Sequence, residues 1–189
     1  MKNQSASLLT LVLFAALLPA QDSGKAGPAS LYPPGTVSGV PNKDVTQANI
    51  AKNICSKKWS TKLIRPPASY TTALKKKQMQ DWKLKGKTGD FEEDHFISLE
   101  NGGDPKDPAN LWPESYKTKI GKQTMGAKQK DLVESYIHDE ICFDVPNHKV
   151  NSGKKYTAKA GVTLARGQEI LATDWYGCYV KMVAGKPCD

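Results

Sequence analysis

The residues best suited to chemistry form a short acidic stretch that contains a histidine. Asp94 and His95 are adjacent, and Glu100 follows shortly after them. A histidine with carboxylates on both sides can act as a general base near neutral pH, beside a metal ion that the carboxylates hold. The alternative for a lone Asp-His pair is an acidic hairpin in which the histidine is only hydrogen-bonded.

The elements that would position this pair are two short strands and a turn. Gly102-Gly103 predicts the turn, because glycine enters positive φ without a steric penalty. The apolar run at 96–99 before the turn and Leu111-Trp112 after it predict the strands. Such a hairpin would place Asp94 and His95 at the end of a strand.

Asp94-His95, the segment 99–105 and the segment 110–113 together resemble the ββα-metal hairpin of HNH (His-Me finger) nucleases. The resemblance extends to small secreted bacterial HNH-like proteins through four further segments, so that it covers roughly residues 44 to 176. These segments are 44–55, 64–71, 130–134 and 164–175.

The resemblance implies an α+β fold with a ββα-metal (His-Me finger) hairpin-helix core and flanking α-helices, in one domain over residues 44–189. It implies that His95 is the general base, that Asp94 is a metal ligand and that Asn110 fixes the hairpin and orients the histidine. The implied activity is metal-dependent hydrolysis of DNA, with RNA as an alternative substrate and with little sequence specificity.

The chain departs from the family at the third metal-site position, which is normally His or Asn on the helix after the hairpin. Neither residue occurs between Trp112 and Ile137. Glu134 and Asp131 are the preferred substitutes, ahead of His138. Oxygen ligands favour Mg²⁺, with Mn²⁺ or Ca²⁺ as alternatives, whereas a histidine ligand would admit Zn²⁺.

Charge is unevenly distributed along a chain of formal net charge +8. Residues 57–87 contain ten Lys or Arg against Asp81, and residues 90–107 contain seven Asp or Glu against Lys106. A basic surface beside an acidic patch is typical of metal nucleases, although a solvated basic face explains the charge equally well. The candidate phosphate contacts are Arg65, Lys75, Lys76, Lys77 and Lys130.

Each of these candidates has a structural alternative, and so does the activity. Arg65 could form a salt bridge beside the proline pair, and Lys130 could be an ordinary lysine on a helix surface. The rival function is a non-catalytic exported module that binds nucleic acid or an anionic polymer of the cell envelope. Nucleic acid is the expected partner, and the protein is expected to be a monomer.

The N-terminal region predicts export. Residues 1–20 have the basic start, the short apolar stretch and the small final residue of a signal peptide. Residues 21–43 are rich in Pro, Gly and Ser, which favours a flexible leader. The mature protein is therefore expected to be secreted or periplasmic, without membrane association after cleavage.

Four cysteines would lie in an oxidising compartment, where disulfides persist. Four cysteines allow three connectivities, and the sequence alone does not choose among them. We favour the pairs Cys55–Cys142 and Cys178–Cys188, because the second pair closes a short loop at the C-terminal end.

Apolar spacing predicts three helices around the hairpin. They begin near Ser69, Ala127 and Thr163, and the second ends near Cys142. The segments 114–126 and 143–161 are polar and are predicted as loops.

Overall fold

The computed structural model describes residues 27–33, 38–153 and 156–188. The predicted signal peptide lies outside these residues. The described chain has a mixed α+β fold, as expected. Its helices are α1 (Ala68–Asp81), α2 (Ala127–Ile141) and α3 (Leu164–Val183), and its strands are β1 (Phe91–His95), β2 (Leu111–Ser115), β3 (Thr118–Ile120) and β4 (Gln123–Met125).

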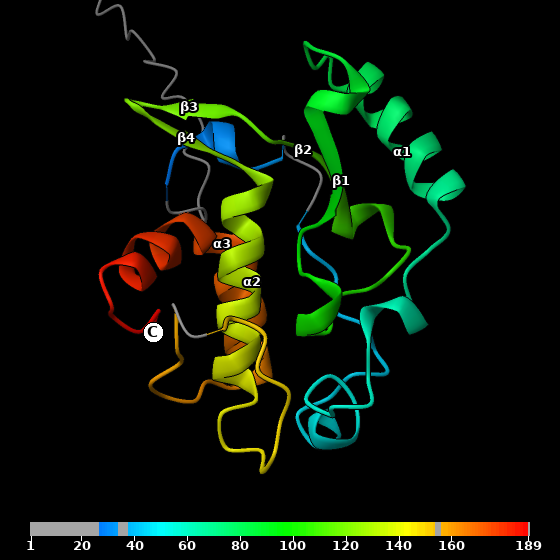
Figure 1. Ribbon diagram of the computed structural model, residues 1–189. Coiled ribbons are helices and arrows are strands. Elements are labelled where there is room, and N and C mark those ends of the chain that lie inside the picture. The colour runs from blue at the N-terminus through cyan, green and yellow to red at the C-terminus, as the bar shows by residue number, and fades with distance from the viewer. Residues whose placement is uncertain (1–26, 34–37, 154–155, 189) are drawn as a thin grey trace, which may run out of the picture.

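The strands form two small antiparallel sheets, β1–β2 and β3–β4. The β1–β2 hairpin lies between α1 on one side and the packed pair α2 and α3 on the other (Figure 1). In its register Asp94 is opposite Trp112 and Glu92 is opposite Glu114. The central hairpin therefore has one face toward α1 and the other toward α2.

The first strand lies earlier in the chain than predicted. β1 is the acidic segment Phe91–His95, and the apolar run at 96–99 follows it as buried irregular chain. The reason is that a side chain, Asn110, satisfies the backbone of Ile97 where a strand partner was expected. The segment 114–126 is also more ordered than predicted, because it contains the β3–β4 hairpin.

Helices α2 and α3 match their predicted positions. Thr163 caps α3, since its hydroxyl accepts a hydrogen bond from the backbone N–H of Arg166 at 3.1 Å. Val133 and Ile137 of α2 and Trp175 of α3 are fully buried in the main core, which accounts for the predicted spacing. Leu132 of α2, by contrast, is 40 % exposed.

The packed part of the chain begins earlier than Asp44. Leu31 and Tyr32 lie in the main core, although the sequence predicts a flexible leader there. The indole Nε1 of Trp175 donates to the carbonyl of Leu31 at 3.3 Å. Two apolar side chains and this bond fix the described residues 27–33 to the domain, so the prediction of a leader is wrong for them.

Both expected disulfides are present. Cys55 is bonded to Cys142, and Cys178 is bonded to Cys188. The first joins the segment before α1 to the end of α2, and the second ties down the end of the chain. None of the described helices is long and apolar enough to cross a membrane.

Candidate active site

Glycines allow the chain to reverse tightly after β1. Gly102 has a φ of 75°, in the left-handed region. A Cβ at Gly103 would lie 1.8 Å from the carbonyl oxygen of Ile97, so only glycine fits there. The turn predicted from Gly102-Gly103 is confirmed, and it brings the segment after β1 close to Asn110.

Asn110 holds this turn together from inside. Its Oδ1 accepts from the backbone N–H of Ile97 at 2.9 Å and of Val40 at 3.2 Å. Its Nδ2 donates to the carbonyls of Ile97 at 3.0 Å and Asp104 at 2.8 Å. The side chain is fully buried, and all of these partners are backbone groups. Asn110 therefore shapes the hairpin, and its hydrogen bonds within the described chain go to backbone groups and not to the His95 ring.

His95 lies at the end of β1 with its ring held by the backbone. Its Nε2 donates to the carbonyl of Pro105 at 3.1 Å, which places the ring proton on Nε2. Within the described residues no group hydrogen-bonds to Nδ1. Burial lowers the pKa of His95, with help from the charges of Arg65 and Lys130 and against the Pro105 bond and Asp94. The imidazole is therefore neutral at neutral pH, with a free lone pair.

The side chain of Lys130, on α2, also reaches strand β1. Its ammonium Nζ donates to Asp94 Oδ2 at 2.7 Å, to the His95 carbonyl at 2.8 Å and to Glu134 Oε1. The Lys130 side chain is 0 % exposed. The sequence-based prediction that Lys130 contacts phosphate is therefore wrong, because its ammonium is enclosed and its three N–H donors are used.

A fourth group, Glu114 of β2, completes this buried cluster. Burial raises the pKa of Glu114 well above its usual value, and the charge of the nearby Asp94 carboxylate adds to that shift. Burial also raises the pKa of Glu134. Asp94 has a lowered pKa, because Lys130 and Glu114 together outweigh its own burial. Lys130 is therefore protonated and Asp94 ionised, so these two side chains carry opposite charges within the cluster.

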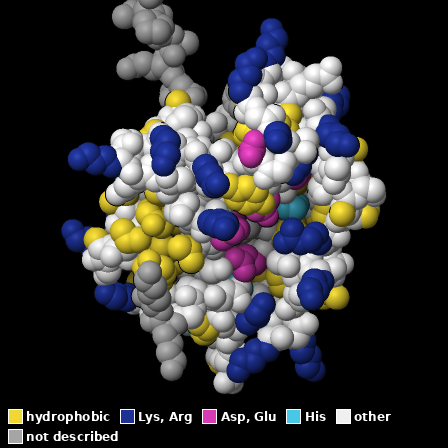
Figure 2. Space-filling view, turned by 45° about the horizontal axis from the view of Figure 1, so that its top comes forward, with side chains coloured by type: hydrophobic (Ala, Val, Ile, Leu, Met, Phe, Trp, Pro, Cys, Tyr) yellow, Lys and Arg dark blue, Asp and Glu magenta, His cyan; other side chains and the backbone are white. Residues whose placement is uncertain are grey.

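A pocket opens beside the cluster, between the chain before α1 and the face of α2. It has a volume of about 270 Å³, and its lining includes Thr61, Arg65, Glu100, Asp131 and Glu134. Partial burial raises the pKa of the Asp131 carboxyl to about 6, and Asp94 and Glu92 add to the shift. Acidic side chains and a histidine gather in one hollow, with lysines and arginines around it (Figure 2).

The remaining predicted site residues do not join the cluster. His138 is buried elsewhere on α2, where its ring contacts Asp139 at 3.2 Å and the Ile54 carbonyl at 3.0 Å. Its place beside the Cys55–Cys142 disulfide makes it a structural residue.

The three consecutive lysines of α1 differ from one another. Lys75 donates to the backbone carbonyls of Thr88 and Phe91, at 3.0 and 2.9 Å. Lys77 forms an ion pair with Asp81 at 2.5 Å, and Lys76 is exposed to solvent. Lys75 thus ties α1 to β1, and the three do not form one uniform phosphate-binding surface.

The site, with Lys130 in it, does not fit the divalent metal that the resemblance implies. The point between Asp94 and Glu134 is taken by the Lys130 ammonium. Among the described residues there is no group of three His, Cys, Asp or Glu side chains placed to share an ion. Asp131 lines the neighbouring pocket and forms no ion pair with Lys130. We therefore assign no chemical step to a metal.

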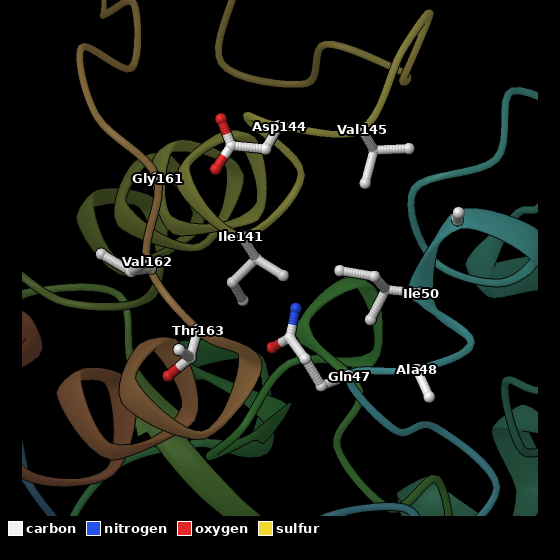
Figure 3. Close-up of a pocket in the computed structure, with 10 residues that line it drawn as sticks. Gln47, Ala48, Ile50, Ile141, Asp144, Val145, Gly161, Val162 and Thr163 are labelled. Atoms are coloured by element: carbon white, nitrogen blue, oxygen red, sulfur yellow. The ribbon is translucent and has the colours of Figure 1, made fainter.

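A larger cavity lies far along α2 from the hairpin, between Ile50, Ile141 and Val162 (Figure 3). Asp144 is its one ionisable lining residue among those described. Gln47 at its edge already accepts a hydrogen bond from the backbone N–H of Leu164 at 2.6 Å. This cavity lacks the paired groups that acid–base chemistry requires, so the hairpin remains the candidate site.

Two residues of the cluster, Glu114 and Lys130, were not predicted from the sequence to belong to it. Glu114 stands directly after Pro113 in the resembled hairpin, and the register pairs it with Glu92, on the same face of the hairpin as Asp94. Lys130 stands four residues before Glu134, the spacing of a helical ion pair. That spacing was the available signal for an internal role of Lys130.

Glu93 is a half-buried titratable group near the site. Both of its carboxyl oxygens are buried and have no hydrogen-bond partner in the described chain. Burial raises the pKa of Glu93 to about 8, against the charge of Lys75. In the unfolded chain the group ionises near its ordinary value, so the folded state loses stability as pH rises from about 4.5 to about 8.

We expect Glu93→Gln to remove this pH-dependent loss. The gain should be near zero at pH 4.5 and reach roughly 1–2 kcal/mol at pH 8, where solvent access limits it. Urea unfolding of both proteins from pH 4.5 to 9 measures the difference. Glu169→Gln, on the exposed surface of α3, is the control. An equal change in stability at every pH would contradict the assignment.

Comparison of the chain with protein families, with characterised proteins and with solved structures finds no match. A functional assignment must therefore come from the residues of the site.

Proposed function

We propose that the protein is an exported HNH-type endonuclease that hydrolyses phosphodiester bonds of DNA with little sequence specificity, built on a ββα hairpin-helix core. The observation that carries the proposal is the state of His95. Its Nε2–H is held by the Pro105 carbonyl, its pKa is lowered and its Nδ1 has no partner among the described residues. A fixed neutral imidazole with a free lone pair is what a general base requires.

In this proposal Nδ1 of His95 removes a proton from a water molecule as the water oxygen attacks phosphorus. The bond from phosphorus to the 3′ sugar oxygen breaks, and that oxygen takes a proton from solvent. The products are a 5′-phosphate and a 3′-hydroxyl. Pro105 holds the ring in one tautomer and one orientation, so the base is positioned before substrate binds.

In this proposal Arg65 binds the phosphate group that is cleaved. Its side chain is exposed, lines the pocket with Asp131 and Glu134, and is close enough to His95 to affect the pKa of the imidazole. A guanidinium can bind two phosphate oxygens at once and stays charged throughout. These observations support Arg65 as the residue that holds the scissile phosphate near the base.

The proposed activity is tested with the full, oxidised protein and a supercoiled plasmid, with single-stranded RNA as a second substrate. We expect nicked and then linear DNA. Parallel reactions with Mg²⁺, with Mn²⁺ and with a chelator measure the cation requirement that the family resemblance implies. Intact plasmid under all three conditions would overturn the proposal.

The buried cluster favours a second candidate function, an exported module that binds nucleic acid or an anionic envelope polymer without cleaving it. Its Lys130 ammonium neutralises the Asp94 carboxylate that would otherwise hold a catalytic cation. The two candidates differ in one outcome, because the binding module retains plasmid in a gel-shift assay and leaves it intact.

Arg65→Gln should weaken duplex binding in either case. Loss of one phosphate contact should lower affinity about equally for any sequence and reduce the slope of log K against log salt by about one contact. Fluorescence anisotropy across a salt titration measures both quantities. Lys186→Gln, near the C-terminal end of the chain, is the matched control and should behave as wild type. Unchanged slopes for Arg65→Gln would remove Arg65 from the interface.

A further inference from the structure

We infer that Lys130 is the resident cation of this site: its ammonium occupies the position of a divalent metal and keeps Asp94 and His95 in place without one. The inference deepens the proposed function, since it concerns the same residues. The test of the inference measures metal binding and thermal stability and not nuclease activity. The inference about Lys130 and the proposed nuclease activity can therefore each fail without the other.

The oxygens around Lys130 Nζ are the donors that a hard cation takes. Asp94 and Glu134 each supply one carboxylate oxygen, and His95 supplies its backbone carbonyl. Such oxygens are typical ligands of Mg²⁺ and Mn²⁺. The ammonium meets the same set with its three N–H donors, one to each oxygen.

The position that Lys130 Nζ occupies is also closed to solvent. Lys130 is 0 % exposed, and the Asp94 side chain is 13 % exposed. Gly126 brings the start of α2 against β2, because a Cβ there would lie 1.9 Å from the Ser115 carbonyl oxygen. Helix α2 therefore enters beside the hairpin at a fixed distance, and Lys130, on its first turn, reaches β1 from there.

The contact with the His95 carbonyl gives the ammonium a positioning role. Lys130 holds the main chain of His95 on one side, while Pro105 holds its ring through Nε2. Lys130 also fixes the adjacent Asp94 carboxylate. A metal in this place would perform the same two tasks, so the built-in charge makes the arrangement independent of divalent cations.

The test compares wild type, Lys130→Ala, Asp94→Asn and Lys128→Ala by thermal melting and by Mn²⁺ electron paramagnetic resonance. We expect wild type and Asp94→Asn to bind the same amount of Mn²⁺, because Asp94 is not available to the ion in wild type. The Tm of wild type should be unchanged by 5 mM Mn²⁺. Loss of a buried ion pair should lower the Tm of Lys130→Ala by roughly 6–20 °C. Mn²⁺ should then bind the vacated oxygens and restore at least half of that loss. Lys128, exposed on the same helix, should change neither readout when replaced.

Three results would overturn the inference. The first is Mn²⁺ binding by wild type that Asp94→Asn abolishes. The second is a Lys130→Ala variant as stable as wild type, and the third is a destabilised variant that Mn²⁺ does not rescue. If Lys130→Ala does not fold, the wild-type and Asp94→Asn titrations still decide whether the position is open to a divalent ion.

Discussion

Replacement of His95 by Ala is expected to lower the rate of plasmid cleavage by at least about 10²-fold, because a positioned general base contributes roughly 10²–10⁴ in rate. Binding of DNA should change little, since His95 is 3 % exposed and acts on the attacking water in the transition state. Single-turnover nicking rates and anisotropy measure the two effects separately.

His95→Gln serves as the matched variant, because a Gln amide can still donate to the Pro105 carbonyl but cannot accept a proton near neutral pH. It should be as inactive as His95→Ala while melting closer to wild type. His148→Ala removes a histidine outside the site, in the segment 143–161, and should leave cleavage unchanged. Activity of either His95 variant within a few-fold of wild type would exclude His95 as the base.

The same rates measured across pH report the protonation of His95. Only the neutral ring can accept a proton, and the pKa of His95 is lowered from its ordinary value by burial. Cleavage should therefore rise with pH through a midpoint below 6.5 and level off before neutral pH. A midpoint above 7 would mean that another group limits the reaction.

The largest expected effect on stability comes from the Cys55–Cys142 disulfide. It closes a loop with a sequence separation of 87 residues, so its removal should cost about 4–5 kcal/mol through the entropy of the unfolded chain. That is a large share of the 5–15 kcal/mol typical of a folded domain. We expect the Cys55→Ala/Cys142→Ala double variant to unfold at a much lower denaturant concentration than wild type.

The Cys178–Cys188 bond provides the internal comparison. Its sequence separation is 10, for which the same reasoning gives about 2.5–3 kcal/mol. Guanidinium unfolding of the two double variants side by side should therefore show the Cys55–Cys142 loss as the greater by about 2 kcal/mol. Equal losses, or a greater loss at the C-terminal bond, would contradict this account.

The helices were predictable because their buried residues recur at helical spacing. Val133 and Ile137 of α2 and Leu171 and Trp175 of α3 are buried, and their spacing is visible in the sequence. Strand β1 was not predictable in the same way. It contains Glu92, Glu93 and Asp94, and an acidic run resembles a solvated loop until tertiary contacts give it partners.

At the candidate site the sequence located Asp94, His95 and Asn110 but misjudged Lys130. The prediction treated Lys130 as a surface lysine or a phosphate contact, as its residue type suggests. Its burial depends on two acceptors from β1 that are 35 and 36 residues away in the chain, besides Glu134 on its own helix. No local sequence pattern predicts this contact between Lys130 and β1, because it depends on how α2 packs beside the hairpin.

The most direct test of the central claim is the fate of the water oxygen. Plasmid is nicked in ¹⁸O-labelled water, and the terminal phosphates are analysed by mass spectrometry. If His95 activates water, one ¹⁸O should appear in each new 5′-phosphate. The amount of labelled 5′-phosphate formed in a given time should fall to background with His95→Gln. Equal ¹⁸O incorporation by wild type and His95→Gln, or bound plasmid with no labelled phosphate at all, would contradict the account.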